Sequence, residues 1–255
     1  MAIGSSDNLV SRVAGAVRGN VLYALIAANA IVFAGVAAGA LLSGAGVPRA
    51  LVLPASLVQL FHQPWCVVSY MFVQASVLQL LFNMLWLYCF GRLMLTVATQ
   101  KRLAFVYAGG GLAGAAFFII WYSMVPGAPG ATLAGASAAV LAVAVAVAFE
   151  LPDMPLQLWL VGSVRMKWVV LVMVALFCFG FTGGAGAAAA HLGGAAFGAA
   201  AGWTERMRRR TVAAPRRTLH DELDDLLDKV KTSGYESLSR RDRERLFQLS
   251  HKVKK

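Results

Sequence analysis

The chain has 255 residues, of which 59% are hydrophobic and only 14% are charged, and its formal net charge is +11. A soluble domain carries about 25% charged residues, so this composition excludes a large soluble core and indicates a membrane protein with several spans. The three cysteines are odd in number and follow no CxxC spacing, which excludes a disulfide framework and a cysteine metal site.

Six apolar segments are predicted to be membrane-spanning helices, which makes the fold class an all-α polytopic membrane protein. They cover residues 20–42, 77–95, 102–124, 136–150, 168–181 and 186–203. The first apolar run is long enough to span and lacks an AxA-type exit, so we expect no cleavable signal peptide. Residues 43–76 hold three prolines among aromatic residues and favour an interfacial or re-entrant piece. The fourth span contains AVAVAVA, which alternates like a strand, but an open strand cannot satisfy its backbone in lipid, so we predict a helix.

The distribution of basic residues predicts the orientation of the spans. All but one of the 23 lysines and arginines lie in segments that six spans would place on one side, and the exception is Arg49 in the first long loop. Because basic residues mark the cytoplasmic side, both termini are predicted to be cytoplasmic. The positive charge is therefore mostly topological and does not indicate a nucleic-acid partner. The sequence RMRRR, with Arg206, Arg208, Arg209 and Arg210, lies where it could also contact anionic lipid of the bilayer.

The sequence predicts three regions: a cytoplasmic N-terminal segment (1–19), a membrane domain (20–203) and a basic cytoplasmic helical tail (204–255). In the tail, five apolar residues fall on one helical stripe: Leu219, Leu223, Leu226, Leu227 and Val230. Gly234 provides a helix stop, and Ser239-x-x-Asp242 is a capping pattern for a second helix. We predict a short helical hairpin that acts as a solvated appendage, in preference to a helix-turn-helix that binds DNA.

Polar residues within the predicted spans include Gln79 and Asn83 in span two, Ser137 at the head of span four and His191 in span six. Each has a structural alternative, because amides four residues apart can bond a neighbouring helix and a serine can bond a carbonyl one turn earlier. Together they also fit catalysis. A neutral imidazole can take the serine proton, and the Gln79 and Asn83 amides can donate to an oxyanion. No acidic residue lies in a span beside His191, so the sequence predicts a dyad rather than a triad.

The expected depths of Ser137 and His191 in the membrane, and the small residues of their two spans, agree with a contact between them. Span four is short, so Ser137 is expected about 10 Å below the outer face, and His191 about 7 to 8 Å below the same face. Small residues recur every fourth position in span six, and span four offers a matching set. The span-six residues are Gly186, Ala190, Gly194, Gly198 and Gly202, and those of span four are Ala134, Ala138 and Ala142. Such stripes let helices approach closely.

The motifs FNMLW in span two, GASAAV at the head of span four and AHLGG in span six resemble, in this order, those of the rhomboid family of intramembrane serine proteases. PWCVVSYMF in the first loop is also similar to the family. VGSVRMKW before span five and the tail sequence look like a bacterial branch of it, which implies a bacterial inner membrane. The resemblance implies a six-helix bundle that cleaves transmembrane segments of other proteins without a cofactor or metal. It also implies Ser137 as nucleophile, His191 as general base, Asn83 as an oxyanion donor and Gly135 as the motif glycine.

The sequence departs from the family pattern at four positions. Gln79 replaces the histidine of the HxxxN motif, Gln74 stands where relatives often have another histidine, and Ala138 replaces the usual glycine. Leu141 stands where an aromatic residue often lies against the catalytic histidine. One alternative is therefore a weak or inactive rhomboid-like protein that binds transmembrane clients. A channel or transporter is a further alternative, but it would be expected to carry intramembrane charge or paired broken helices, and only span four is shortened.

Overall fold

The computed structural model describes residues 19–44, 46–125, 130–158, 162–179, 184–213 and 219–253. The predicted N-terminal segment lies outside these residues except for Gly19, and so does much of the loop before span four. The chain divides into two compact units between Arg206 and Met207.

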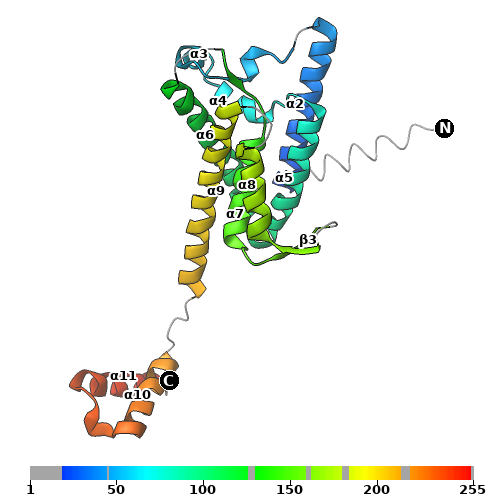
Figure 1. Ribbon diagram of the computed structural model, residues 1–255. Helices are drawn as coiled ribbons and strands as arrows, with labels where there is room; N and C mark the ends of the chain where they lie inside the picture. The colour runs from blue at the N-terminus through cyan, green and yellow to red at the C-terminus, as the bar shows by residue number, and fades with distance from the viewer. Residues whose placement is uncertain are drawn as a thin grey trace, which may run out of the picture. The chain divides into compact units, whose positions relative to one another are not determined.

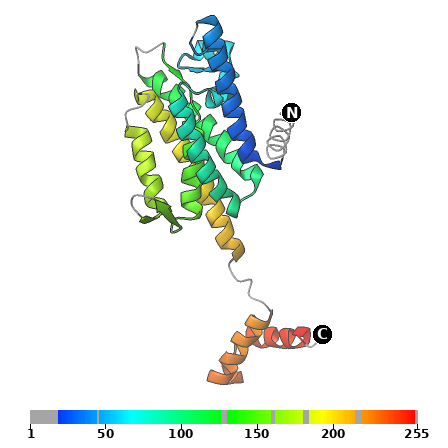
Figure 2. The same ribbon diagram turned by 90° about the vertical axis from the view of Figure 1, so that its right-hand side faces the viewer.

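The first unit is a helical bundle (Figures 1 and 2). Its principal helices are α2 (Val21–Ser43), α5 (Val77–Val97), α6 (Gln100–Met124), α7 (Ser137–Glu150), α8 (Met166–Phe179) and α9 (Gly184–Ala213), whose last turns belong to the second unit. Among the described residues, α2, α5 and α6 are long and apolar enough to cross a membrane, and α7 and α8 are shorter apolar helices. The count of six spans stays a prediction. Helix α9 continues about ten residues past the predicted end of the sixth span.

Helix α7 is the buried centre of this unit, and it packs against α5, α6 and α8. Every residue from Ala138 to Ala148 is buried. A helix that is enclosed on all sides needs no polar face, so alternating alanine and valine fit a helix here as well as they would fit a strand. Its 14 residues are about 21 Å long, which is less than the hydrocarbon core of about 30 Å. The N-terminus of α7 can therefore lie within the apolar layer.

Helix α9 packs along α7 through small residues. Three of its glycines lie so close to the α7 backbone that a Cβ atom would meet a carbonyl oxygen. These contacts join Gly194 to Ala138, Gly198 to Ala142 and Gly202 to Ala146. Gly186, which the sequence assigned to the same stripe, instead faces the ring of Tyr122 on α6. The stripe turns away from α7 there because α9 extends past the first residue of α7.

The segment between α2 and α5 is folded onto the bundle. It contains the short helices η1 (Arg49–Leu51), α3 (Leu57–His62), α4 (Cys66–Ser69) and η2 (Tyr70–Phe72). Its strand β1 (Leu53–Pro54) pairs antiparallel with β2 (Thr132–Leu133), which immediately precedes α7. A second antiparallel pair, β3 (Pro155–Leu158) and β4 (Gly162–Arg165), connects α7 to α8. The first sheet fixes the chain that enters α7.

An ionic cluster joins three helices at the far end of α7 from Ser137. Arg102 of α6 donates hydrogen bonds to Glu150 of α7 at 2.8 and 3.1 Å and pairs with Glu205 of α9 at 3.4 Å. It also donates to the carbonyl oxygen of Ala201. The Glu150 side chain is fully buried and that of Glu205 nearly so, so Arg102 compensates two carboxylates that have little access to water.

The second unit contains α10 (Leu219–Ser233), η3 (Tyr235–Ser237) and α11 (Arg240–Val253). Leu226, Leu238 and Leu249 form its small core, with Leu223 and Val230 packed against it. Two local predictions are confirmed. Gly234 ends α10 with a φ of 83°, and the Ser239 hydroxyl accepts a bond from the Asp242 N–H at the start of α11.

The predicted apolar stripe of α10 was too wide, because Leu227 is about half exposed. Arg245 of α11 forms a two-pronged ion pair with Glu222 of α10 and so links the two helices across this unit.

Candidate active site

Ser137 and His191 meet where α7 begins. The Nε2 atom of His191 lies 2.8 Å from the Oγ atom of Ser137, although the two residues are 54 positions apart in the chain. His191 is buried, at 4% exposure, whereas Ser137 is partly exposed. The close seam between α7 and α9 makes this contact possible, because the Cα of Gly194 lies one turn beyond His191 and directly against Ala138.

The other ring nitrogen of His191 fixes the direction of this hydrogen bond. Nδ1 lies 2.7 Å from the carbonyl oxygen of Phe177 on α8. A carbonyl can only accept, so Nδ1 carries the proton, and the neutral ring presents a bare Nε2 to the serine hydroxyl. The Phe177 ring also lies edge-on to the imidazole, with centroids 5.2 Å apart. A backbone carbonyl thus has the orienting role that an aspartate has in a catalytic triad.

The chain before Ser137 is shaped by Gly135. This glycine has a φ of 134°, which side chains rarely adopt, and its N–H donates to the carbonyl oxygen of Tyr70 at 3.0 Å. The next residue, Ala136, is the N-cap of α7, so Ser137 is the first helical residue. The first N–H groups of a helix have no intrahelical acceptor and lie at the positive end of its dipole. Donors for a developing negative charge are therefore available beside Oγ.

The side chain of Gln79 packs against Gly135. Its Oε1 accepts from the N–H of Ala75 at 2.7 Å, and its Nε2 donates to the carbonyl oxygen of Ala134 at 3.3 Å. The amide nitrogen has a second hydrogen that these bonds do not use. Gln79 therefore ties the start of α5 to the loop that carries the motif glycine.

Asn83 belongs to a buried chain of polar side chains that crosses the bundle. Its Nδ2 donates to Gln74 at 2.8 Å, and Gln74 donates in turn to Asn29 of α2 at 2.9 Å. Asn29 donates to the Tyr107 hydroxyl of α6, which donates to the carbonyl oxygen of Met71. Asn29, Gln74 and Asn83 are each at most 2% exposed. The chain fixes the Asn83 amide and leaves one of its N–H groups available.

The structure thus brings Ser137, His191, Gly135 and Gln79 around the first turn of α7, and it holds Asn83 one turn after Gln79 on α5. Sequence reasoning missed the carbonyl oxygen of Phe177, since a backbone acceptor has no signature. Leu141, which stands where relatives often have an aromatic residue, is fully buried. The aromatic contact with the histidine comes from Phe177 of α8 instead.

Residues 62–208 match the rhomboid domain. The chain belongs to the rhomboid family. The match covers more than half of the sequence and includes all five predicted site residues. Residues 212–252 match a family of unknown function, DUF6576, which covers α10 and α11. The comparison with curated proteins found no match to the chain.

Membership of the rhomboid family and the apolar helices indicate that this rhomboid protein is an integral membrane protein. Rhomboid proteins are typically serine proteases that act on transmembrane substrates. Helix α2, which contributes Asn29 to the polar chain behind Asn83, precedes the matched rhomboid region.

Proposed function

We propose that this rhomboid protein is an intramembrane serine endopeptidase that cleaves transmembrane segments of other proteins with a Ser137–His191 dyad. The observation that carries the proposal is the pair of hydrogen bonds on the imidazole. Phe177 holds the proton on Nδ1, and Nε2 faces Oγ at 2.8 Å. This is the arrangement that a general base needs to activate a hydroxyl nucleophile.

In the proposed reaction, Ser137 Oγ attacks the scissile carbonyl carbon while its proton passes to His191 Nε2. The resulting oxyanion accepts hydrogen bonds from the Ser137 N–H and from the unused N–H groups of Asn83 and Gln79. When the C–N bond breaks, His191 gives its proton to the leaving amine. Water then attacks the acyl-enzyme, with the same histidine as base, and releases Ser137.

The proposal includes the orientation of the protein in the membrane. With both termini cytoplasmic, as the basic residues predict, the start of α7 lies toward the outer face and the Arg102 cluster toward the cytoplasm. This orientation suits a site that meets substrates from the outer half of a bacterial inner membrane. The arginines of residues 206–210 would then lie at the cytoplasmic surface, where anionic lipid is available.

The deciding experiment is cleavage of a labelled single-span substrate in liposomes by wild type, Ser137→Ala and His191→Ala. We expect cleavage by wild type alone. Ser123→Ala is a matched control, because that exposed hydroxyl donates to the carbonyl of Ile119 within α6. It should cleave like wild type.

Labelling with a fluorophosphonate provides a second readout that needs no substrate. Wild type should be labelled at Ser137, and both dyad variants should not. Full cleavage by Ser137→Ala would overturn the proposed mechanism. If wild type neither cleaves nor reacts with the probe, the protein is instead a rhomboid-like binder of transmembrane clients.

A further inference from the structure

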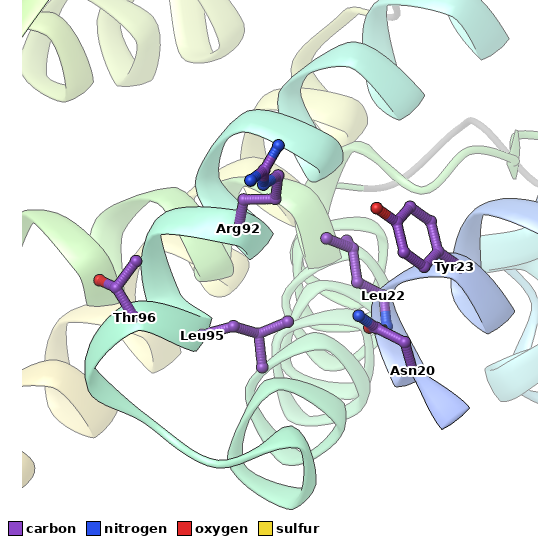
Figure 3. Close-up of a pocket in the computed structure, with 6 residues that line it drawn as sticks. All are labelled: Asn20, Leu22, Tyr23, Arg92, Leu95 and Thr96. Carbon is purple, nitrogen blue, oxygen red and sulfur yellow. The ribbon is translucent and has the colours of Figure 1, made fainter. Parts of the chain in front are cut away.

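A pocket separate from the candidate active site lies between the start of α2 and the end of α5 (Figure 3). Its volume is about 330 Å³, and it is lined by Asn20, Leu22, Tyr23, Arg92, Leu95 and Thr96. This volume lies at the lower end of the range for small-ligand sites, about 300–1,000 Å³. The lining combines an arginine, two other polar donors and an apolar floor.

The walls of this pocket are held in place by neighbouring contacts. Gln100, at the start of α6, accepts from the N–H of Val21 at 2.6 Å and donates to the carbonyl oxygen of Gly19 at 2.9 Å. Leu22 is fully buried against Gly91, where a Cβ atom would come within 2.6 Å of the leucine side chain. The first turn of α2 is thereby fixed against α5, so the pocket is preformed.

Arg92 gives the pocket a positive charge, and no carboxylate of the described residues pairs with it. In the part of the chain that the structure describes, no ion pair joins Arg92 to an acidic residue, and the sequence holds no Asp or Glu between Asp7 and Glu150. Its Nη1 donates to the Tyr88 hydroxyl at 2.9 Å, which leaves further N–H groups of the guanidinium for a ligand. Arg102, by contrast, has two carboxylate partners.

Two other side chains can donate beside Arg92. The Asn20 Oδ1 accepts the N–H of Leu22 as the N-cap of α2, so its amide N–H groups are available. The hydroxyl of Tyr23 extends toward Arg92 in Figure 3, and the Asn20 amide lies beside Leu22 in the pocket lining. Thr96 already donates to the carbonyl oxygen of Leu93. The pocket therefore offers one fixed cation and two neutral donors, a set that suits an anionic oxygen cluster.

We propose that this pocket binds a phosphate group. Its place at the ends of two spans suits the headgroup of an anionic phospholipid, since basic pockets between transmembrane helices on the cytoplasmic side bind such headgroups. Inorganic phosphate carries the same chemistry and is the other possible source. The inference goes beyond the proposed protease function and does not depend on catalysis.

The test is binding of phosphatidylglycerol to the full-length protein, measured by native mass spectrometry during a titration in neutral detergent. Arg92→Gln should weaken binding about tenfold or more, because hydrogen bonds to a charged group are lost. Arg92→Lys keeps the charge but loses the planar fork, so its loss should be smaller. Lys101→Gln is the matched control. It removes one exposed cation from the start of α6 without touching the pocket lining, and its affinity should stay within about twofold of wild type.

Equal affinity of Arg92→Gln and wild type would overturn the proposal. Equal losses in Arg92→Gln and Lys101→Gln would also overturn it, because only the general surface charge would then matter. A parallel titration with inorganic phosphate separates the two sources. Displacement of the lipid from wild type by phosphate identifies phosphate itself as the ligand, whereas retention of the lipid identifies the headgroup in its bilayer setting. Thermal unfolding of each variant checks that it is folded. If Arg92→Gln does not fold, Arg92→Lys tests the pocket instead.

Discussion

The amide nitrogen of Gln79 occupies the space that a Cβ atom at residue 135 would need. A Cβ on Gly135 would lie 2.5 Å from Nε2 of Gln79 and 3.7 Å from the Oγ of Ser137. The glycine therefore lets an amide of α5 and the serine of α7 approach the same point. The sequence pattern G-x-S and the position of Gln79 are two parts of one packing arrangement.

Gly135→Ala should abolish or strongly reduce cleavage. The substitution introduces a side chain where φ is 134° and pushes Gln79 away from the first turn of α7. Cleavage of a labelled single-span substrate in liposomes measures the loss. Gly130→Ala in the same connection is the control, because among the described residues none beyond its chain neighbours lies within 4 Å of a Cβ there. Equal activity of the two variants would show that Gln79 has room to move.

Gln79→His should leave cleavage equal to or higher than that of wild type. An imidazole can donate to the oxyanion as the amide does, and it can also become cationic. Gln79→Ala removes the donor and should lower the rate by about 10²- to 10³-fold. Rates at saturating substrate give the comparison. A large loss in Gln79→His would mean that the site depends on the two bonds by which Gln79 joins Ala75 to Ala134.

Gln74→Leu should destabilise the bundle and lower activity together. The change leaves the buried amides of Asn29 and Asn83 without the partner that joins them, at a cost of about 1–3 kcal/mol in the free energy of unfolding. Thermal unfolding in detergent and the liposome assay measure the two effects. Gln59→Leu on exposed α3 is the control and should change neither. An unchanged unfolding temperature for Gln74→Leu would contradict the proposed role of the polar chain.

Arg102→Met should cost about 3–5 kcal/mol in stability, because it removes the guanidinium that pairs with the buried carboxylates of Glu150 and Glu205. Unfolding by a graded denaturant measures the change. Lys167→Met is the control, since Lys167 pairs with the largely exposed Asp153 and should matter much less.

The contribution of the control pair, Lys167 with Asp153, to stability depends on pH. The hydrogen bond from Lys167 lowers the pKa of Asp153, so the small contribution of that pair is present above the ordinary carboxyl pKa. It is lost as the pH falls through the lowered value.

A smaller effect of Arg102→Met than of Lys167→Met would contradict the assignment of Arg102 as the charge that holds α6, α7 and α9 together.

Helical periodicity and side-chain chemistry predicted much of the fold and of the candidate site. The start of α7 at Ser137 and its helical conformation agree with expectation, because backbone groups in an apolar layer must bond within a helix. The family resemblance is confirmed by the rhomboid match. The roles of Ser137, His191, Asn83 and Gln79 in catalysis stay predictions until activity is measured.

Other features depend on contacts that no local pattern reveals. The carbonyl oxygen of Phe177 has no sequence signature, and Gln74 was noticed only as a departure from relatives, not as the link between two spans. Helix α9 ran past its predicted end because charged residues after Trp203 continue a helix as readily as apolar ones once they leave the lipid. Gly186 faces Tyr122 because α9 extends past the first residue of α7. Only the three-dimensional packing determines this extension.

The Arg102 cluster also has a consequence for the order of biosynthesis. Arg102 is made first, and its first carboxylate, Glu150, follows 48 residues later at the end of α7. Its second carboxylate, Glu205, comes only with α9, the helix that also carries His191. A nascent chain cannot complete this cluster until the candidate general base has already been synthesised. Closure of the ionic cluster and assembly of the dyad are thus late events in the same translation interval.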